Sequence, residues 1–544
     1  MSNFQSSYSS EEFEQAIGSA LLNKKAYYNI TQDKGSNYST LSEAIGAVSD
    51  NAYKVNGLVL TFYNGADWVE KRFNGTGSEE FADESKWVDT CCGEEVVITE
   101  KLSITIQSNQ AQPDAALNGA KVTITYLDVT KEHTWNGTEI IEEIPLSVEY
   151  TITFGGIQGY STPESKKFTS IAGNVRNVSA EYTKIAADVI TINQSISDPD
   201  TMVSGDVNGE VIQWIRQNSH RVLAKKTADG KITYCRLKDD DGTKYYDGSV
   251  ADLTGTEGDV FVKLPTFYYY GTEGDNVELH FAKEKLDDNY IEWDTNILIG
   301  AYESYNSKSK CYSRSGVEST QSVSQANWKS YAQARGTGYQ LVDWQMHCVL
   351  GCLYYAMYGN TNCQATIGVG TNSYHKINGQ TDALGMTDTK ASTNGNSQSI
   401  NFWGLENWWG NKIEWMEEDN IDANMSTYDP VTKGSRNVAV PDYIGFYLKK
   451  MKFGRYLDLI VADDDPKNGG DSVGYCDFQY WDKAAATRVV LRSSNNSGTS
   501  GGVACAYAHN ASSSTSSYSG SRLAFRGVTT EAESVTAFKA LPNL

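Results

Sequence analysis

Residues 488–527 read RVVLRSSNNSGTSGGVACAYAHNASSSTSSYSGSRLAFRG, and this stretch organises the interpretation of the whole chain. The 29 residues from Ser493 to Ser521 include 11 serines and no residue with a formal charge. Low complexity of this kind is typical of a flexible linker. However, the apolar runs 489–491 and 523–525 flank the segment and predict strands, each next to an arginine. We therefore expect an ordered segment with both ends anchored in one fold.

The composition of this segment indicates recognition rather than reaction. Serine, asparagine, tyrosine, glycine and histidine are the residues of an antibody paratope, in which tyrosine supplies rigid contact area and small polar side chains supply adaptable hydrogen bonds. We therefore predict a water-facing contact surface here.

Segments upstream predict the core on which such a surface would rest. Residues 208–216 predict a short amphipathic helix, and residues 340–358 predict a longer helix that Gly359 ends. The apolar side chains that share one face of the longer helix are Leu341, Trp344, Cys348, Cys352 and Tyr355. Residues 401–416, NFWGLENWWGNKIEWM, form the densest aromatic passage. Its rings could stack sugars in a groove, but we favour a glycine-kinked core in which the tryptophans pack on one another.

No local motif signals catalysis or a bound metal. The acidic runs 239–241 and 463–465 could offer oxygen ligands to calcium, but neither has the EF-hand layout, so we favour solvated loops. Cys348 and Cys352 are four residues apart beside His347, and we favour buried thiols over metal ligands because structural zinc usually needs two such pairs. The chain contains no Walker loop. We expect no cofactor, no metal and no enzymatic activity.

Two smaller domains precede the aromatic region. In residues 1–93, a helix-like stretch at 10–22 is followed by a predicted hairpin whose strands, 57–62 and 68–73, flank Asn-Gly. From about residue 96 to 185 the apolar pattern has a period of two, which is typical of a small β-sandwich. The runs with this period are 102–106, 122–126, 148–154 and 178–182.

Length and charge exclude several classes of protein. A chain of 544 residues, 40% of them apolar, can form several cored domains. Its formal charge of −22 makes nucleic acid a poor partner. The first 16 residues lack the pattern of a secretory signal, and the longest apolar run, 348–358, is about half the roughly 20 residues that span a membrane. We expect synthesis in the cytoplasm, no membrane insertion and no disulfide framework for the nine cysteines.

Three motifs carry a resemblance to known families. Residues 410–415, GNKIEW, resemble the G-N-x-W-E-W signature of the formylglycine-generating-enzyme branch of C-type-lectin-like folds. Residues 338–344, GYQLVDW, and the segment 488–527 resemble the variable proteins of diversity-generating retroelements, which share that fold. From residue 188 onward the chain resembles the receptor-binding tail fibre proteins of phages and prophages of gut Bacteroides-type bacteria. Residues 150–163 resemble prealbumin-like or immunoglobulin-like spacers.

These resemblances imply a multidomain, mostly β and α+β protein. Its parts would be an N-terminal α+β tail-attachment module (1–93), an immunoglobulin-like β-sandwich spacer (96–185) and a C-type-lectin-like receptor-binding head (188–544). In the family, an error-prone reverse transcriptase rewrites adenines near the 3′ end of the gene, which implies a variable region at about 488–527. The implied diversified positions, which we take as the ligand-binding residues, are Asn495, Ser497, Thr499, Ser500, Tyr507, His509, Asn510, Ser513, Ser514, Thr515, Ser517 and Tyr518.

The implied function is that of a phage tail adhesin. The patch would bind a polysaccharide or protein receptor on the bacterial host surface, and the N-terminal module would bind tail or baseplate proteins. The family further implies a homotrimeric fibre located in the virion.

Two alternatives use the same head. An enzyme of the formylglycine-generating type would need a pair of reactive cysteines close together, whereas the candidates Cys476 and Cys505 are 29 residues apart and Cys505 lies inside the variable stretch. A bacterial cell-surface adhesin would keep the head but change the location, and the N-terminal sequence does not favour export.

Overall fold

The structure is a computed structural model of the 544-residue chain. It describes residues 27–29, 45, 59–63, 68–74, 80–89, 99–109, 115–157, 159–171, 173–228, 230–371, 375–390, 398–421, 424–440, 443–462, 470, 472–482, 487–493 and 501–543. The chain divides into two compact units, residues 1–184 and residues 185–544, which are described separately. It is multidomain and mostly β.

The first unit begins with a four-stranded sheet. Its order is β1 (Tyr27–Asn29), β2 (Val59–Tyr63), β3 (Trp68–Phe73) and β4 (Trp87–Asp89). Strands β2 and β3 pair antiparallel, which confirms the predicted hairpin strands. The rings of Phe73, Phe81 and Trp87 lie 4.9–5.4 Å apart and pack beside the sheet. The predicted helix 10–22 and the Asn-Gly turn lie outside the described residues.

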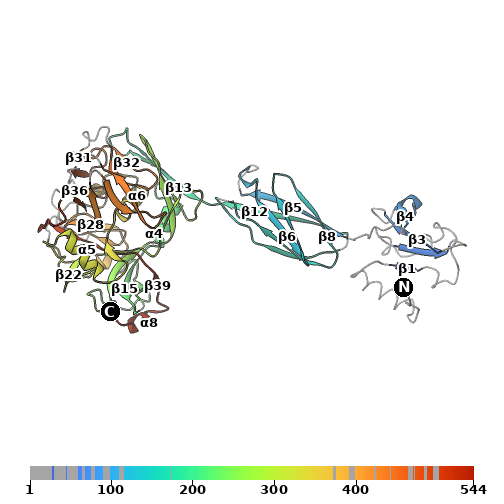
Figure 1. Cartoon of the computed structure of the whole chain (residues 1–544), viewed down its shortest axis with the longest axis horizontal. Helices are drawn as coiled ribbons and strands as arrows, with labels where there is room; N and C mark the ends of the chain where they lie inside the picture. The colour runs from blue at the N-terminus through green and yellow to red at the C-terminus, as the bar shows by residue number, and fades with distance from the viewer. Residues whose placement is uncertain are drawn as a thin grey trace. The chain divides into compact units, whose positions relative to one another are not determined.

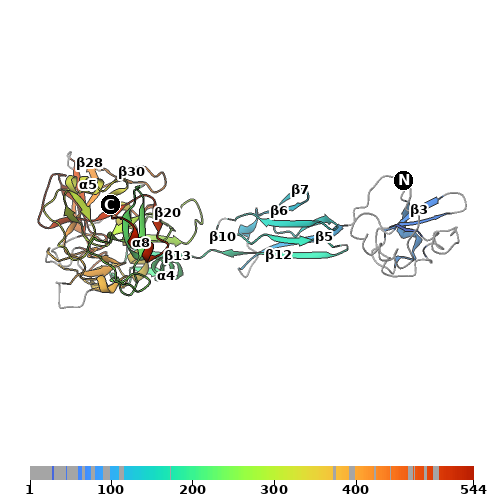
Figure 2. The ribbon, with the colours of Figure 1, turned by 90° about the horizontal axis from the view of Figure 1, so that it is seen from below.

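Two further sheets of the first unit form a sandwich (Figures 1 and 2). One sheet has the order β10 (Tyr160–Ser161), β12 (Val175–Lys184), β5 (Thr99–Ser108) and β8 (Ile140–Pro145). The other has the order β11 (Lys166–Thr169), β9 (Glu149–Phe154), β6 (Lys121–Tyr126) and β7 (Val129–Thr134). Alternate side chains of both sheets share one core, among them Ile104, Ile124 and Val178. The four period-two runs are therefore strands, as predicted.

The second unit, here called the head, is built on three large sheets. The five-stranded sheet has the order β14 (Val203–Gly205), β13 (Ala187–Asn193), β19 (Asn276–Ala282), β18 (Phe267–Gly271) and β20 (Ile291–Trp293). The seven-stranded sheet has the order β24 (Tyr339–Leu341), β38 (Leu523–Phe525), β21 (Leu298–Gly300), β17 (Asp259–Lys263), β15 (His220–Lys226), β16 (Ile232–Arg236) and β39 (Thr529–Glu531).

The eight-stranded sheet contains the strands that border the serine-rich segment. Its order is β30 (Ser435–Ala439), β29 (Asn424–Tyr428), β28 (Ile413–Ile421), β35 (Arg488–Arg492), β36 (Ala506–Asn510), β34 (Phe478–Asp482) and β31 (Tyr443–Tyr447), with β37 (Ser519–Ser521) also paired to β28. The segment therefore follows β35, contributes β36 and β37 to the same eight-stranded sheet, and then reaches the seven-stranded sheet at β38. Both flanking strands were predicted.

Smaller elements complete the head. The short strands are β22 (Tyr305–Ser307), β23 (Lys310–Tyr312), β25 (Thr389–Lys390), β26 (Ile400–Phe402), β27 (Leu405–Glu406), β32 (Met451–Lys452) and β33 (Ile460–Val461). The α-helices are α4 (Glu210–Gln217), α5 (Gln325–Gln333), α6 (Trp344–Tyr358), α7 (Cys363–Thr366) and α8 (Val535–Ala540). Helix α4 confirms the predicted short helix.

Helix α6 forms the centre of the head core. It begins four residues later than predicted, because residues 339–341 pair with β38 as a strand and Asp343 caps the helix by accepting from the Met346 N–H. It ends where predicted, at Gly359, whose φ is 61°. The prediction of a single apolar face was wrong, because the helix is buried on all sides from Trp344 to Ala356.

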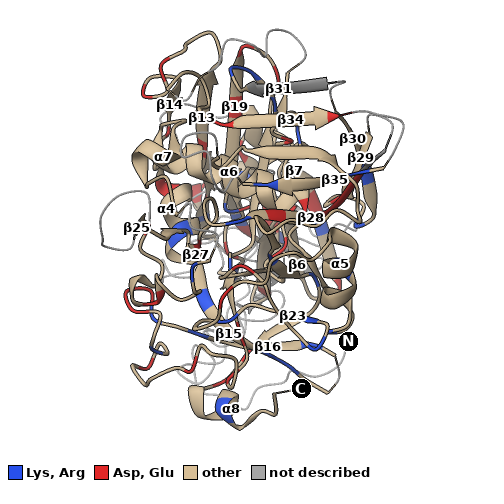
Figure 3. Cartoon of the chain, turned by 90° about the vertical axis from the view of Figure 1, so that its left-hand side faces the viewer, with Lys and Arg blue, Asp and Glu red and all other residues tan. Residues whose placement is uncertain are grey.

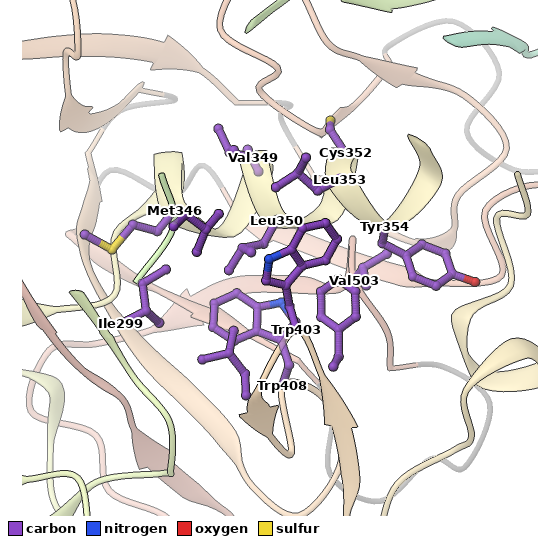
Figure 4. Close-up of a cluster of buried hydrophobic side chains, with 14 of the residues drawn as sticks. Ile299, Met346, Val349, Leu350, Cys352, Leu353, Tyr354, Trp403, Trp408 and Val503 are labelled. Carbon is purple, nitrogen blue, oxygen red and sulfur yellow. The ribbon is translucent and has the colours of Figure 1, made fainter. Parts of the chain in front are cut away.

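The aromatic passage 401–416 belongs to this core. Trp403, Trp408 and Trp409 have no exposed surface, and Figure 4 shows Trp403 and Trp408 packed against Leu350 of α6. A tryptophan buried in this way cannot stack a ligand, so the core interpretation is correct and the sugar-platform alternative is excluded for these three rings.

Candidate binding surface

Strand β36 carries part of the predicted patch on one of its two faces. Successive strand residues point to opposite faces, and here Ala506 and Ala508 are buried while Tyr507 is partly exposed and His509 is exposed. Strand β34 follows the same pattern, with Phe478 and Tyr480 partly exposed and Gln479 and Trp481 buried. The neighbouring strands thus present rings of the same kind to solvent.

These rings form a continuous row across three strands. We define the aromatic row as Tyr447, Phe478, Tyr480, Tyr507 and His509. The ring centres of Tyr447 and Phe478 are 5.6 Å apart, those of Phe478 and Tyr507 are 6.0 Å apart, and those of Tyr480 and His509 are 4.7 Å apart. Such distances are typical of favourable aromatic pairs. The row is therefore a preorganised surface of rigid side chains.

The aromatic row is nearly free of charge. Partial desolvation lowers the pKa of His509, and Arg488 lowers it further against the opposing effect of Asp482. The imidazole is therefore neutral at neutral pH. Figure 3 shows strand β34 without a basic residue and with an acidic residue only at its end, Asp482.

Residues 511–518, here called the serine loop, are held by backbone hydrogen bonds. The Ser322 N–H donates to the Ser516 carbonyl at 3.0 Å, and the Ile413 N–H donates to the Tyr518 carbonyl at 3.0 Å. Within the loop, the Ser514 N–H donates to the Ala511 carbonyl at 2.9 Å. Because these bonds join main-chain atoms, they do not depend on which side chains the loop carries.

Two buried arginines anchor the ends of the segment to one carboxylate. Arg492, at the end of β35, and Arg522, next to β38, both form ion pairs with Glu414, and the Arg522 Nε is 3.0 Å from Glu414 Oε1. All three side chains are at most 1% exposed. The Arg492 guanidinium also lies 3.4 Å from the centre of the Trp408 ring. Burial lowers the pKa of Arg492 to about 10, and the facing Glu414 opposes this shift.

The structure brings most of the predicted site residues together. Eight of the twelve lie within the described residues, and each of the eight is partly or fully exposed: Tyr507, His509, Asn510, Ser513, Ser514, Thr515, Ser517 and Tyr518. The other four lie outside the described residues: Asn495, Ser497, Thr499 and Ser500.

Sequence analysis missed three members of the aromatic row. Tyr447, Phe478 and Tyr480 come from strands that precede the serine-rich segment. The alternation in FQYWD at 478–482 was the available signal, but the pairing of β34 with β36 depends on the tertiary fold.

The other candidates are dispersed or buried. The 239–241 run is a surface turn in which Asp241 forms an ion pair with Lys244, and the 463–465 run lies outside the described residues. Cys348 and Cys352 are fully buried, as favoured, and burial raises the pKa of both thiols. Cys476 and Cys505 are buried as well, and burial raises the pKa of Cys505. None of the seven cysteines within the described residues forms a disulfide.

Two kinds of feature are absent from the described residues. No cluster of three or more histidine, cysteine, aspartate or glutamate side chains there has an arrangement that could hold a metal ion. No helix in that part of the chain is both long enough and apolar enough to cross a membrane.

Comparison with protein-family models finds no match, and comparison with curated proteins finds none either. Among solved structures, the C-terminal fragment of the pilus adhesin SpaC from Lactobacillus rhamnosus GG is 16% identical, with 23% of this chain and 58% of that chain covered and a TM-score of 0.15. The Bacillus anthracis TIE protein is 13% identical, with 35% and 32% covered and a TM-score of 0.17. The shaft pilin SpaA from Lactobacillus rhamnosus GG is 14% identical, with 36% and 94% covered and a TM-score of 0.15.

Structural similarity this low does not support a conclusion about the fold or role of this chain. The chain spans 58% of the length of the first of these structures. The fold and the surface therefore define only a broad class, that of multidomain, β-rich proteins. Its head presents an ordered aromatic and serine-rich face.

Proposed function

We propose that this chain is an adhesin that binds a receptor on a bacterial surface through the aromatic row and the serine loop. The observation that carries the proposal is that all eight described patch positions are partly or fully exposed, on a backbone whose ends are fixed by the buried Arg492–Glu414–Arg522 cluster. On such a scaffold, the contact side chains can change while the core stays the same.

The specific form of the proposal is a phage tail fibre. The head would be C-type-lectin-like, the sandwich would be an immunoglobulin-like spacer, and residues 1–93 would attach to tail or baseplate proteins in the virion after synthesis in the host cytoplasm. A homotrimer would multiply weak contacts by avidity. The motif resemblance at 338–344, 410–415 and 488–527 supports this form, and it needs no catalytic step.

Adhesion is tested with the purified full chain and a panel of gut Bacteroides-type strains. Binding to cells is measured by flow cytometry for the wild type and for the variant Tyr507→Ala/His509→Ala/Tyr518→Ala. We expect at least about a tenfold loss, because aromatic anchors dominate binding energy. Tyr518 is 47% exposed, and Tyr246, outside the patch, is 44% exposed, so Tyr246→Ala is a matched control that keeps binding. Equal binding by the triple variant would refute the assigned surface.

The location is tested separately. An antibody against the head should label the tails of phage particles induced from the strain that encodes the chain. Label on the bacterial envelope in the absence of particles would replace the tail fibre with the cell-surface adhesin, without affecting the assigned binding surface.

A further inference from the structure

A second candidate site lies at the other edge of the eight-stranded sheet. A hollow of about 490 Å³ opens between α5, the N-terminal end of α6 and the strands β28, β29 and β30. This volume is within the range of small-molecule sites. Strands β29 and β30 contribute amide and hydroxyl side chains to its wall, among them Asn424, Ser426 and Asn437. None of the residues of the aromatic row or the serine loop lines it.

Carboxylates outnumber cations in this hollow. Among the described residues that line it, Asp343, Glu417, Glu418 and Asp419 are acidic and Lys329 is the one basic residue. The Lys329 Nζ lies 3.7 Å from a carboxylate oxygen of Glu417 and 3.7 Å from one of Asp419.

Asp343 already has a cationic partner outside the lining. The Arg526 Nε donates to it at 2.7 Å. Four carboxylates and two cations leave the site two positive charges short if all of these groups are ionised.

The side chain of Glu418 indicates that the hollow binds a ligand. Its side chain is 3% exposed, and its Oε1 accepts from the Trp344 N–H at 2.7 Å and from the Thr427 hydroxyl at 2.7 Å. Its Oε2 has no hydrogen-bond partner among the residues that the structure describes. A buried carboxylate oxygen without a donor costs free energy, because its lost hydration is not replaced.

The pKa of Glu418 reflects the same shortage of positive charge in the hollow. Burial and the neighbouring Asp343 raise the pKa of Glu418 to about 8, although the hydrogen bonds from Trp344 and Thr427 act against this shift. Burial also raises the pKa of Glu417, and Lys329 opposes it. A further cation in the hollow would relieve both effects.

We propose that this hollow binds a small organic cation, specifically a primary ammonium group on a hydroxyl-bearing molecule such as an amino sugar. An ammonium group has three N–H donors and no acceptor, which suits the unpartnered oxygen of Glu418 and the adjacent carboxylates. The amides and hydroxyls of β29 and β30 suit the hydroxyl groups of the ligand. This site is separate from the adhesive surface and does not depend on the proposed function.

A metal ion fits the hollow less well. The described residues contain no cluster of three or more side chains arranged to hold one. Asp343 and Glu418 also already use carboxylate oxygens to accept from the first residues of α6.

The test is a calorimetric titration of the full chain with glucosamine and, in parallel, with glucose, which has the same ring but lacks the amine. We expect glucosamine to bind at least about tenfold more tightly. Equal affinities, or binding of calcium with no binding of glucosamine, would overturn the proposal.

Two variants assign the binding to this hollow. Glu418→Gln has nearly the same shape but cannot become an anion on binding the ammonium group, and it should weaken glucosamine binding at least about tenfold. Lys329→Met removes the competing cation and should strengthen binding about tenfold, a gain that a misfolded protein could not produce. Weaker binding by Lys329→Met would contradict the proposal even if Glu418→Gln failed to fold.

Asp477→Asn is the matched control. Asp477 is also a buried carboxyl group whose pKa burial raises to about 8, but it is not part of the lining of the hollow. Its substitution should leave glucosamine affinity unchanged, whereas an equal loss in both variants would show a general effect on the head and overturn the assignment.

Discussion

At the scale of single residues, Glu414 explains how the two ends of a low-complexity segment are held in the head. Its carboxylate lies between two buried guanidinium groups that come from the two sides of the segment. Removing one partner of a buried ion pair costs far more than the pair contributes, because the remaining charge stays buried and uncompensated. Here a single substitution leaves two such charges.

The first prediction concerns this cluster. Glu414→Ala should lower the free energy of unfolding of the head by about 3–5 kcal/mol, measured by urea denaturation with tryptophan fluorescence. Glu531→Ala is the control, since Glu531 pairs with Arg236 at 2.6 Å on the surface, and it should cost about 1 kcal/mol or less. Similar losses in the two variants would mean that the cluster does not anchor the segment.

Sequence analysis covered the stretches that contain the cluster but singled out none of its three members. The GNKIEW motif contains Glu414, and each predicted flanking strand was noted to lie next to an arginine. Their meeting depends on β28 pairing with β35 and with β37, which are separated from it by about 70 to 100 residues. Local periodicity contains no information about such a contact.

At the scale of elements, the predictions succeeded where one strand or helix determines its own pattern. The strands of the sandwich could be predicted because apolar residues alternate along them, which matches their alternating burial. The end of α6 could be predicted because glycine often ends a helix in the left-handed conformation, which Gly359 adopts. The start of α6 was missed because Tyr339–Leu341 pairs with β38, about 180 residues away. Tertiary pairing there overrides the helical pattern.

The second prediction concerns the end of α6. Gly359→Ala places a Cβ at positive φ and 2.8 Å from Val207 Cγ1, so it should destabilise the head by about 2–4 kcal/mol. Gly230 also has a positive φ, 83°, but a Cβ there would meet no atom within 4 Å, so Gly230→Ala should cost about 1 kcal/mol. The difference between the two unfolding midpoints measures the steric part, and equal costs would exclude it.

The third prediction concerns strand β5 of the sandwich. Glu100 is fully buried, and burial raises its pKa, but hydrogen bonds from Arg176, Tyr150 and Asn174 outweigh this effect and lower the pKa to about 2. The folded carboxylate therefore binds a proton more weakly than the unfolded one, whose ordinary pKa is 4.5. Its stabilisation is complete above about pH 4.5 and is lost as the pH falls towards 2.

Hydrogen exchange measured by mass spectrometry locates this effect in the sandwich. Peptides that cover β5 and β12 should lose protection in the wild type as the pH falls from about 4.5 to 2, after correction for the intrinsic exchange rate. In Glu100→Gln these peptides should be less protected at neutral pH and should change little over that range. Glu181→Gln, an exposed change in β12, should behave as the wild type does. A wild type that keeps its protection at pH 2 would contradict the role of Glu100.

At the scale of the whole molecule, the serine-rich segment connects two sheets of one unit. Strand β38, which follows the segment, lies between β24 and β21, and β39 pairs with β16. The C-terminal strands therefore complete the seven-stranded sheet, and the exposed positions of the segment lie between strands that the head core requires. Composition and period could predict a β-rich head, but they could not predict which sheet each of its strands joins.

The last prediction follows from the division of the chain at Lys184. Among the residues that the structure describes, the buried core of the sandwich draws on positions 102 to 182, whereas the cores of the head draw on positions from 190 onward. Since each unit buries its own apolar surface, a fragment of residues 185–544 should fold alone and melt within about 3 °C of the head transition in the full chain. Differential scanning calorimetry of the fragment and the full chain measures both transitions. A fragment that melts more than about 10 °C lower would show that the head depends on residues 1–184 for its stability.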